Sequence, residues 1–246
     1  MRKADLLNSS ISLLGLVFMI APLASAPKFP VTESASNRKD WIDLFDGQTL
    51  NGWKGDPVYW RVEDNSIVGE VTPETILENN SFLIYQGDAP PNFELLVEYR
   101  VSPEGNSGVQ YRSEVFKQVP WALKGYQADI HGRDRWTGQN YEERGRTFLA
   151  LRGQVTLLET GKPAVVIGSL GDKDELQEKV KKEDWNAYHI IVNGNVLTHI
   201  LNGHVMSVVV DNDTENRRTD GRIGVQVHVG PPMKIEFRTI RLRPLD

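Results

Sequence analysis

The sequence predicts an all-β protein, a two-sheet antiparallel sandwich of jelly-roll type with one short surface helix. Short runs that alternate apolar and polar residues recur along the chain with turn residues between them, as strands of a sandwich do. Two Asn-Gly pairs, at 193–194 and 202–203, supply the positive φ angles that tight hairpin turns need. Only one stretch, residues 173–185, has helical spacing, with Leu176 and Val180 four apart among charged residues.

The alternation predicts the strands in chain order. Residues 93–101 are the clearest example, because Phe93, Leu95, Val97, Tyr99 and Val101 share one face. The two Asn-Gly turns divide residues 187–211 into three consecutive antiparallel strands. The apolar phase shifts between Phe237 and Ile240, which predicts a bulge near Thr239. The remaining expected strands lie within residues 41–47, 58–71, 81–87, 107–112, 126–131, 147–153, 163–168, 221–229 and 234–245.

The N-terminus is typical of a secretory signal peptide over residues 1–26. A basic start is followed by the apolar run "ISLLGLVFMIAPL" and the small-residue pattern Ala24–Ala26. The run is too short to predict a stable membrane span. We expect a polar linker over residues 27–40 and one domain over 41–246. We therefore expect the mature chain to be exported, to the periplasm or outside the cell, without a membrane span.

The charge and amino-acid composition of the chain argue against some classes of function. The net charge is −5, and Lys and Arg are scattered rather than clustered, which argues against a nucleic-acid partner. The chain has no cysteine, so the domain has no disulfides. Six Trp and seven Tyr suit a β-rich core or a sugar-binding surface.

Three predicted strands share an unusual design, an apolar face opposite a face of amide, acidic and basic side chains. Because successive side chains of a strand alternate between its faces, each polar set lies on one side of its strand. If the three strands are neighbours, the faces merge into one polar surface suited to a ligand. The three sets are Asn106, Gly108, Gln110, Arg112 and Glu114; Gln127, Asp129 and His131; Gln226 and His228.

The loop over residues 132–146, "GRDRWTGQNYEERGR", is dense in Arg, Glu, Trp and Tyr. Long charged and aromatic loops beside a sheet often carry binding residues. Trp136 and Tyr141 are placed either to stack on a sugar ring or to pack the loop down. Glu142 and Glu143 are adjacent, so in an extended segment their side chains point apart.

Several segments, in this order, resemble the 3-keto-disaccharide hydrolase family, long catalogued as domain of unknown function 1080. They are "LFDGQTLNGW" (44–53), "GNSGVQYR" (105–112), "GYQADI" (125–130), "DWNAYHIIVNGNVLTHILNG" (184–203), "GRIGVQVH" (221–228) and "IEFRTIRL" (235–242). The resemblance covers about residues 41–244. It implies a concanavalin A-like sandwich in an exported bacterial protein, with 3-keto-glucoside 1,2-lyase and 3-keto-2-hydroxy-glucal hydratase chemistry.

The chemistry that this resemblance implies needs a base for the acidic C2 proton, a partner for the enolate oxygen and an acid for the leaving group. We expect His131 to be the base, with Asp129 or His228 next, and Arg112 to stabilise the enolate. Glu114, Glu142 and Glu143 are candidate acids or oxygen ligands. Substrate-binding candidates are Asn106, Gln110, Glu114, Gln127, Trp136, Tyr141, Glu142 and Gln226. Asp129, His131 and His228 are an alternative ligand set for a divalent metal ion.

Two other functions stay open at this point. A non-catalytic carbohydrate-binding module needs the aromatic residues and amides but no base. A glycosidase with paired carboxylates is disfavoured, because the predicted strand faces offer no evident carboxylate pair. His189, His199 and His204 lie among hairpin residues and are expected to be structural or exposed.

Overall fold

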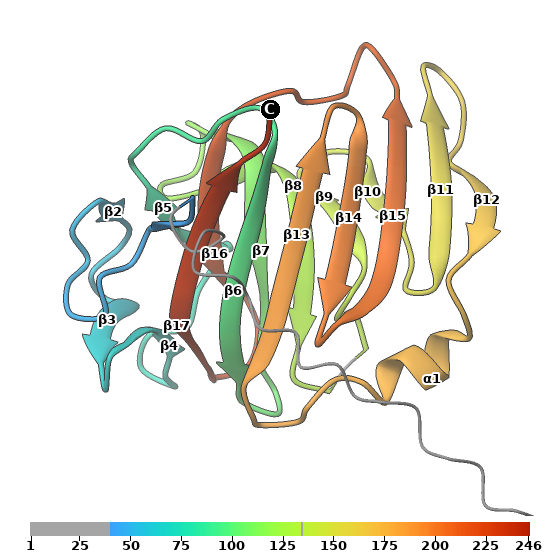
Figure 1. Cartoon of the computed structure of the whole chain (residues 1–246). Coiled ribbons are helices and arrows are strands. Elements are labelled where there is room, and N and C mark those ends of the chain that lie inside the picture. Colours follow the sequence, from blue (N-terminus) through green and yellow to red (C-terminus); the bar gives the residue numbers. More distant parts are fainter. Residues whose placement is uncertain (1–39, 134) are drawn as a thin grey trace, which may run out of the picture. The chain divides into compact units, whose positions relative to one another are not determined.

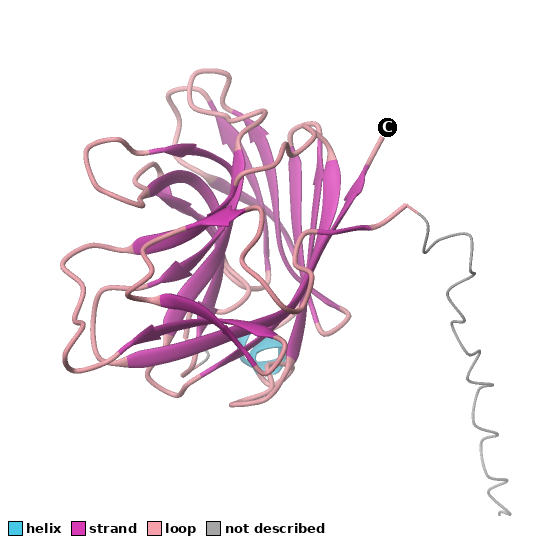
Figure 2. Ribbon diagram, turned by 90° about the vertical axis from the view of Figure 1, so that its left-hand side faces the viewer, coloured by secondary structure: helices cyan, strands magenta, loops and turns pink. Residues whose placement is uncertain are grey.

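The computed structural model describes residues 40–133 and 135–246, which fold as two β-sheets packed face to face (Figures 1 and 2). This confirms the predicted all-β sandwich. Within these residues no helix is long and apolar enough to cross a membrane. The expected signal peptide, and all of the expected linker except Asp40, lie outside the described residues.

One sheet has ten strands and the order β12-β11-β15-β14-β13-β6-β17-β4-β3, with β1 beside β17. All its strand pairs are antiparallel except β11 with β15. Its strands are β1 (Ile42–Asp43), β3 (Trp60–Glu63), β4 (Ser66–Val71), β6 (Phe93–Val101), β11 (Gln154–Glu159), β12 (Val165–Ser169), β13 (Asn186–Asn193), β14 (Val196–Leu201), β15 (His204–Asn212) and β17 (Met233–Pro244).

The other sheet has seven strands and the order β10-β9-β8-β7-β16-β5-β2, all antiparallel. The three strands with polar faces are therefore neighbours, at β8, β7 and β16, as the merged surface requires. The strands are β2 (Trp53–Lys54), β5 (Ser81–Tyr85), β7 (Asn106–Val115), β8 (Leu123–His131), β9 (Asn140–Glu143), β10 (Thr147–Ala150) and β16 (Arg222–Val227).

The core lies between the sheets and follows the alternation. The apolar positions of β6 are buried, and Val109, Tyr126 and Ile130 of the smaller sheet are fully buried opposite them. A polar cluster crosses this core: the Tyr111 hydroxyl contacts His199 Nε2 at 2.9 Å and accepts a hydrogen bond from Asn140 Nδ2 at 2.9 Å. Burial lowers the pKa of His199 to about 3, so its imidazole is neutral. Through Asn140, this cluster holds β9 against the core.

The C-terminal predictions are confirmed. β13, β14 and β15 are consecutive antiparallel neighbours joined by the two Asn-Gly turns, where Gly194, Asn202 and Gly203 have positive φ. The register of β17 against β6 shifts between Phe237 and Thr239, at the expected bulge.

The helix is shorter than predicted. Helix α1 covers only Lys173–Gln177, capped by the Asp172 side chain, with Leu176 buried. The prediction of a helix to residue 185 was wrong. The Asn186 side chain bonds both the amide and the carbonyl of Lys181 at 2.8 Å, which draws the chain into β13 instead of a further helical turn.

Candidate functional site

The outer face of β7, β8 and β16 carries a hydrogen-bonded network of three glutamines and one aspartate. We call it the polar floor: Gln110, Gln127, Asp129 and Gln226. Gln110 Nε2 donates to Gln127 Oε1 at 2.8 Å, and Gln127 Nε2 donates to Asp129 Oδ1 at 2.7 Å. Gln226 Nε2 also donates to Gln127 Oε1, at 3.3 Å. All four side chains are buried. Since two amides donate to the Gln127 oxygen, its nitrogen faces Asp129.

Gly108 makes room for the side chains of the polar floor. A Cβ atom at Gly108 would lie 2.4 Å from Gln127 Cδ, so the Gln127 side chain lies directly across the glycine. Gly108 pairs with Asp129 in the register of β7 and β8. A glycine in a strand often marks such a close approach.

A pocket of about 470 Å³ opens beside the polar floor. The pocket is lined by Asn80, Asn106, Gln127, Asp129, Trp136, Tyr141, Glu143, Thr147, Phe148 and His228.

Two carboxyl groups share the pocket. Burial raises the pKa of Asp129 to about 8, the Gln127 hydrogen bond opposes the rise, and the nearby Glu143 carboxylate adds to it. Burial also raises the pKa of Glu143, against the Arg144 charge and a hydrogen bond from Asn80 at 3.3 Å. Asp129 therefore carries a proton at neutral pH, which makes it a proton donor rather than an anion.

His228 contributes a neutral imidazole to the pocket. Burial lowers its pKa below 6.5, with the backbone hydrogen bond to Val229 working against this. Its Nδ1 is bonded to the Val229 carbonyl oxygen. A carbonyl only accepts, so Nδ1 carries the proton and Nε2 keeps its lone pair.

An aromatic wall of Trp136, Tyr141 and Phe148 closes one side. The Phe148 ring lies 5.4 Å from the Trp136 ring and 5.1 Å from the Tyr141 ring, measured between centroids. Phe148 is 42% exposed, which is high for a large apolar side chain. An exposed aromatic surface beside a polar pocket suits the apolar face of a sugar ring or an aromatic group.

Arg112, which we expected to stabilise the enolate, lies outside the pocket. Arg112 has a φ of 43° at a register irregularity in β7, which turns its side chain away from the floor. Its guanidinium is almost fully buried and donates to the carbonyl oxygens of Pro91, Gly194 and Arg218. It ties three loops together and does not line the pocket.

Glu114 and Glu142 also lie outside the pocket. Glu114 is exposed beyond the irregularity and pairs with Arg218 at 2.8 Å. Glu142 is buried and pairs with Arg146 at 2.6 Å, and Arg146 also pairs with Asp211 at 2.7 Å. Glu142 and Glu143 point apart as predicted. Only Glu143 reaches the pocket.

His131 does not line the pocket either. It ends β8 beside Asn106, and its Nδ1 accepts a hydrogen bond from the backbone of Arg133 at 3.1 Å. Over residues 40–133 and 135–246, no group of three His, Cys, Asp or Glu side chains is placed to hold a metal ion. The expected set of Asp129, His131 and His228 therefore does not fit one.

Sequence reasoning missed Asn80, Thr147 and Phe148. Asn80 connects β9 to the segment after β16, because its Oδ1 accepts from Val229 N at 3.0 Å while its Nδ2 donates to Glu143. A single Asn in a loop carries no signal for that role. Phe148 did carry a signal, because alternation in "TFLA" places it on the strand face that does not bear the buried Leu149. Of the predicted residues, Asn106, Gln127, Asp129, Trp136, Tyr141, Glu143 and His228 line the pocket, with Gln110 and Gln226 bonded to Gln127.

Comparison with known structures supports the fold. The chain is similar to a candidate glycosyl hydrolase from Parabacteroides distasonis, with 19% identity, a TM-score of 0.58, and 88% and 99% of the two chains covered. It is also similar to the carbohydrate-binding module CBM66 of Bacillus subtilis, with 12% identity, a TM-score of 0.51, and 78% and 95% covered.

Sequence comparison gives a more specific relationship. The chain is 37% identical over 81 residues to a 3-keto-disaccharide hydrolase of Bacteroides thetaiotaomicron, a match covering 30% of this chain and 28% of that relative. The profile of the 3-keto-alpha-glucoside-1,2-lyase-like domain matches residues 40–243, nearly the whole described fold. The chain therefore belongs to the 3-keto-alpha-glucoside-1,2-lyase-like domain family.

Proposed function

We propose that this chain is an exported enzyme that cleaves 3-keto-glycosides by removing the C2 proton, eliminating the C1 substituent and hydrating the product. One observation carries the proposal: a neutral His228 and a protonated Asp129 share one pocket. Base and acid coexist at neutral pH because burial shifts their pKa values in opposite directions.

The first half-reaction uses these groups in turn. His228 Nε2 takes the C2 proton, which the C3 ketone has made acidic, and the electrons move onto the C3 oxygen. The enolate then re-forms the ketone, makes a C1–C2 double bond and breaks the bond from C1 to the leaving oxygen. Asp129 gives that oxygen its proton. The Asn106 side-chain amide lines the same pocket and supplies a donor for the enolate oxygen in place of Arg112.

The second half-reaction returns the groups to their starting state. Ionised Asp129 takes a proton from water, whose oxygen adds to C1. Protonated His228 gives its proton to C2. The sum of both halves is hydrolysis, which agrees with the name of the Bacteroides relative.

A direct glycosidase is the second candidate, favoured by the unexpected pairing of Asp129 with Glu143 in one pocket. That mechanism needs one carboxylate ionised as nucleophile or base. Burial raises the pKa values of both carboxyl groups, which favours the elimination route.

The test offers the chain 3-keto-trehalose and 3-keto-sucrose beside the unoxidised sugars. We expect loss of the keto-sugars only, with transient absorbance of the unsaturated ketone. Cleavage of an unoxidised disaccharide at a similar rate would favour the glycosidase. Saturable binding of a sugar without turnover would favour a carbohydrate-binding module.

A further inference from the structure

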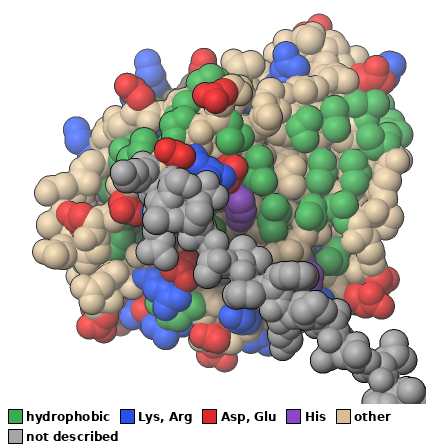
Figure 3. Space-filling model, viewed as in Figure 1, with side chains coloured by type: hydrophobic (Ala, Val, Ile, Leu, Met, Phe, Trp, Pro, Cys, Tyr) green, Lys and Arg blue, Asp and Glu red, His purple; other side chains and the backbone are tan. Residues whose placement is uncertain are grey.

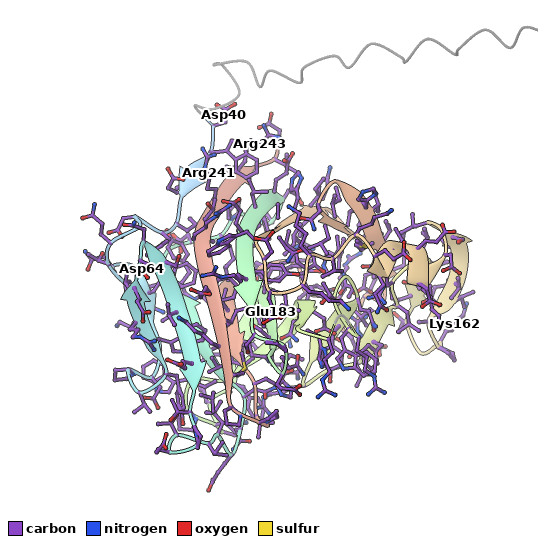
Figure 4. The ribbon with its side chains drawn as sticks, turned by 90° about the horizontal axis from the view of Figure 1, so that it is seen from below. Asp40, Asp64, Lys162, Glu183, Arg241 and Arg243 are labelled. Atoms are coloured by element: carbon purple, nitrogen blue, oxygen red, sulfur yellow. The ribbon has the colours of Figure 1, made fainter. Side chains whose placement is uncertain are left out.

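The outer face of the ten-stranded sheet is divided into a charged half and an apolar half. On β6 and β17, neighbouring side chains form ion pairs: Arg100 with Glu236 at 2.7 Å, Arg238 with Glu98 at 2.8 Å and Arg243 with Glu94 at 2.8 Å. Figure 4 labels Arg241 and Arg243 in this half, and Lys162, in the turn before β12, at the other end of the sheet. Paired charges of this kind are expected on a strand face that is exposed to water.

In the described residues, the other half has ion pairs only at its borders: His189 of β13 with Glu94 at 3.0 Å, and Lys162 with Glu159 at 3.0 Å. Between these borders the outward positions are half-buried or exposed, are aliphatic or Thr, and alternate with buried core residues. Figure 3 shows the hydrophobic side chains gathered over β13, β14, β15 and β11. The apolar half comprises Val155, Leu157, Val165, Ile191, Val196, Thr198, Ile200, Val205, Val208 and Val210.

The edge strand β12 contributes Val165 to this surface and is apolar along most of its length. Val165, Val166 and Ile167 are 51%, 55% and 53% exposed, three large apolar residues in succession. The opposite edge, β3, carries Arg61 and Glu63 in an ion pair at 2.8 Å. Charged edges discourage pairing with other chains, whereas an apolar edge without charge invites it.

We propose that the apolar half is the interface through which two copies of this chain pack sheet against sheet. A face whose centre is apolar and uncharged offers no partner for a charged protein or a polar glycan. Its complement is another apolar sheet face, and a second copy supplies one through a twofold axis.

The size of the face agrees with a weak dimer. Five strands about 4.8 Å apart, each presenting about six residues, span roughly 24 by 20 Å, or roughly 480 Å² per copy. Two copies would bury roughly 1,000 Å², near the lower limit for a specific interface. The polar pocket lies on the other sheet and stays open, so the contact leaves the proposed reaction unobstructed.

The test is sedimentation velocity of the full chain over concentrations from about 1 to about 300 μM, a range that suits an interface of this size. We expect a concentration-dependent shift from monomer to dimer. Val208→Lys at the centre of the face should abolish the shift. So should the milder triple variant Val155→Thr, Val208→Thr and Val210→Thr, which keeps shape and strand propensity. Circular dichroism checks that each variant folds.

Arg238→Gln, on the charged half of the same sheet, is the matched control and should leave the shift unchanged. Val166→Lys, on the edge strand, should leave it largely unchanged. A wild type that stays monomeric throughout would overturn the proposal. Loss of the dimer in Val166→Lys alone would assign the contact to the strand edge instead. A monomer that floats with neutral phosphatidylcholine vesicles would assign the face to lipid.

Discussion

Gln127 donates its side-chain amide to Asp129 Oδ1 at 2.7 Å, and both residues line the same pocket. Gln110 and Gln226 both donate to Gln127 Oε1, and this orients the Gln127 amide nitrogen toward Asp129. This occupies Oδ1 as an acceptor and leaves Oδ2 to carry the proton. A buried amide chain thus sets the orientation of the group that we propose as the acid.

Substitution of His131 and of His228 tests which histidine is the base: the sequence predicts His131, whereas the structure favours His228. His228→Gln should lower kcat by about 10² to 10⁴, the usual contribution of a general base. His131→Gln should stay within a few-fold of wild type, because His131 does not line the pocket. Steady-state kinetics on a 3-keto-disaccharide measures both. The reverse order of effects would restore His131 as the base.

Activity should follow a bell-shaped pH profile. It falls in acid as His228 is protonated, at a pH below 6.5, and falls in alkali near pH 8 as Asp129 loses its proton. Asp129→Asn should remove the alkaline limb together with most of the activity. An alkaline limb that persists in the residual activity of this variant would assign that limb to another group.

Stability should also depend on Asp129. Its pKa in the folded state, about 8, lies above that of the unfolded chain, so the folded state holds a proton that the unfolded state has released between about pH 4 and pH 8. The free energy of unfolding therefore falls as pH rises through that window. Asp129→Asn should remove this slope and be more stable than wild type above pH 8, by roughly 2 to 5 kcal/mol. Urea unfolding at pH 5 and pH 9 measures the difference, and equal slopes would contradict the assignment.

Gly108→Ala should disturb the polar floor, because its Cβ would lie 2.4 Å from Gln127 Cδ. We expect a loss of about 1 to 3 kcal/mol in stability from overpacking. We also expect a loss of activity at a temperature where the variant is fully folded. Gly168→Ala is the matched control, since its Cβ would meet Val155 no closer than 3.4 Å. Full activity in Gly108→Ala would show that the amide chain is dispensable.

The aromatic wall should act in binding. Phe148→Ala removes the ring between Trp136 and Tyr141 and should raise KM by about tenfold, the effect of losing about 1.4 kcal/mol of contact, with a smaller change in kcat. Trp185→Ala serves as control, because Trp185 stacks on Arg100 and Arg238 of the other sheet. An unchanged KM in Phe148→Ala would remove the wall from substrate binding.

Arg112→Gln tests the structural role that replaces the catalytic one. Its guanidinium donates to backbone carbonyls of three loops, so its loss leaves buried oxygens unpaired, at a cost of about 2 to 4 kcal/mol. Thermal unfolding should show the loss. Well below the transition kcat should be retained, and a selective fall in kcat without loss of stability would return Arg112 to the reaction.

The sequence alone determined what local periodicity controls. Alternation assigned the faces of β6, β8 and β16 and of β7 as far as Tyr111. The Asn-Gly pairs located two hairpins, and the phase shift near Thr239 located the bulge. These features depend on neighbouring residues and backbone angles, so they can be read along the chain.

Only the tertiary structure decided which side chains meet. Asp129 and Glu143 come from different strands, and one irregularity in β7 sends Arg112 to Pro91 and Gly194 instead of the floor. Burial raises the pKa of Asp129 and lowers that of His228, and this burial exists only once the sheet and the aromatic wall enclose the pocket. A pKa depends on surroundings assembled from distant parts of the chain, and local sequence pattern does not record them.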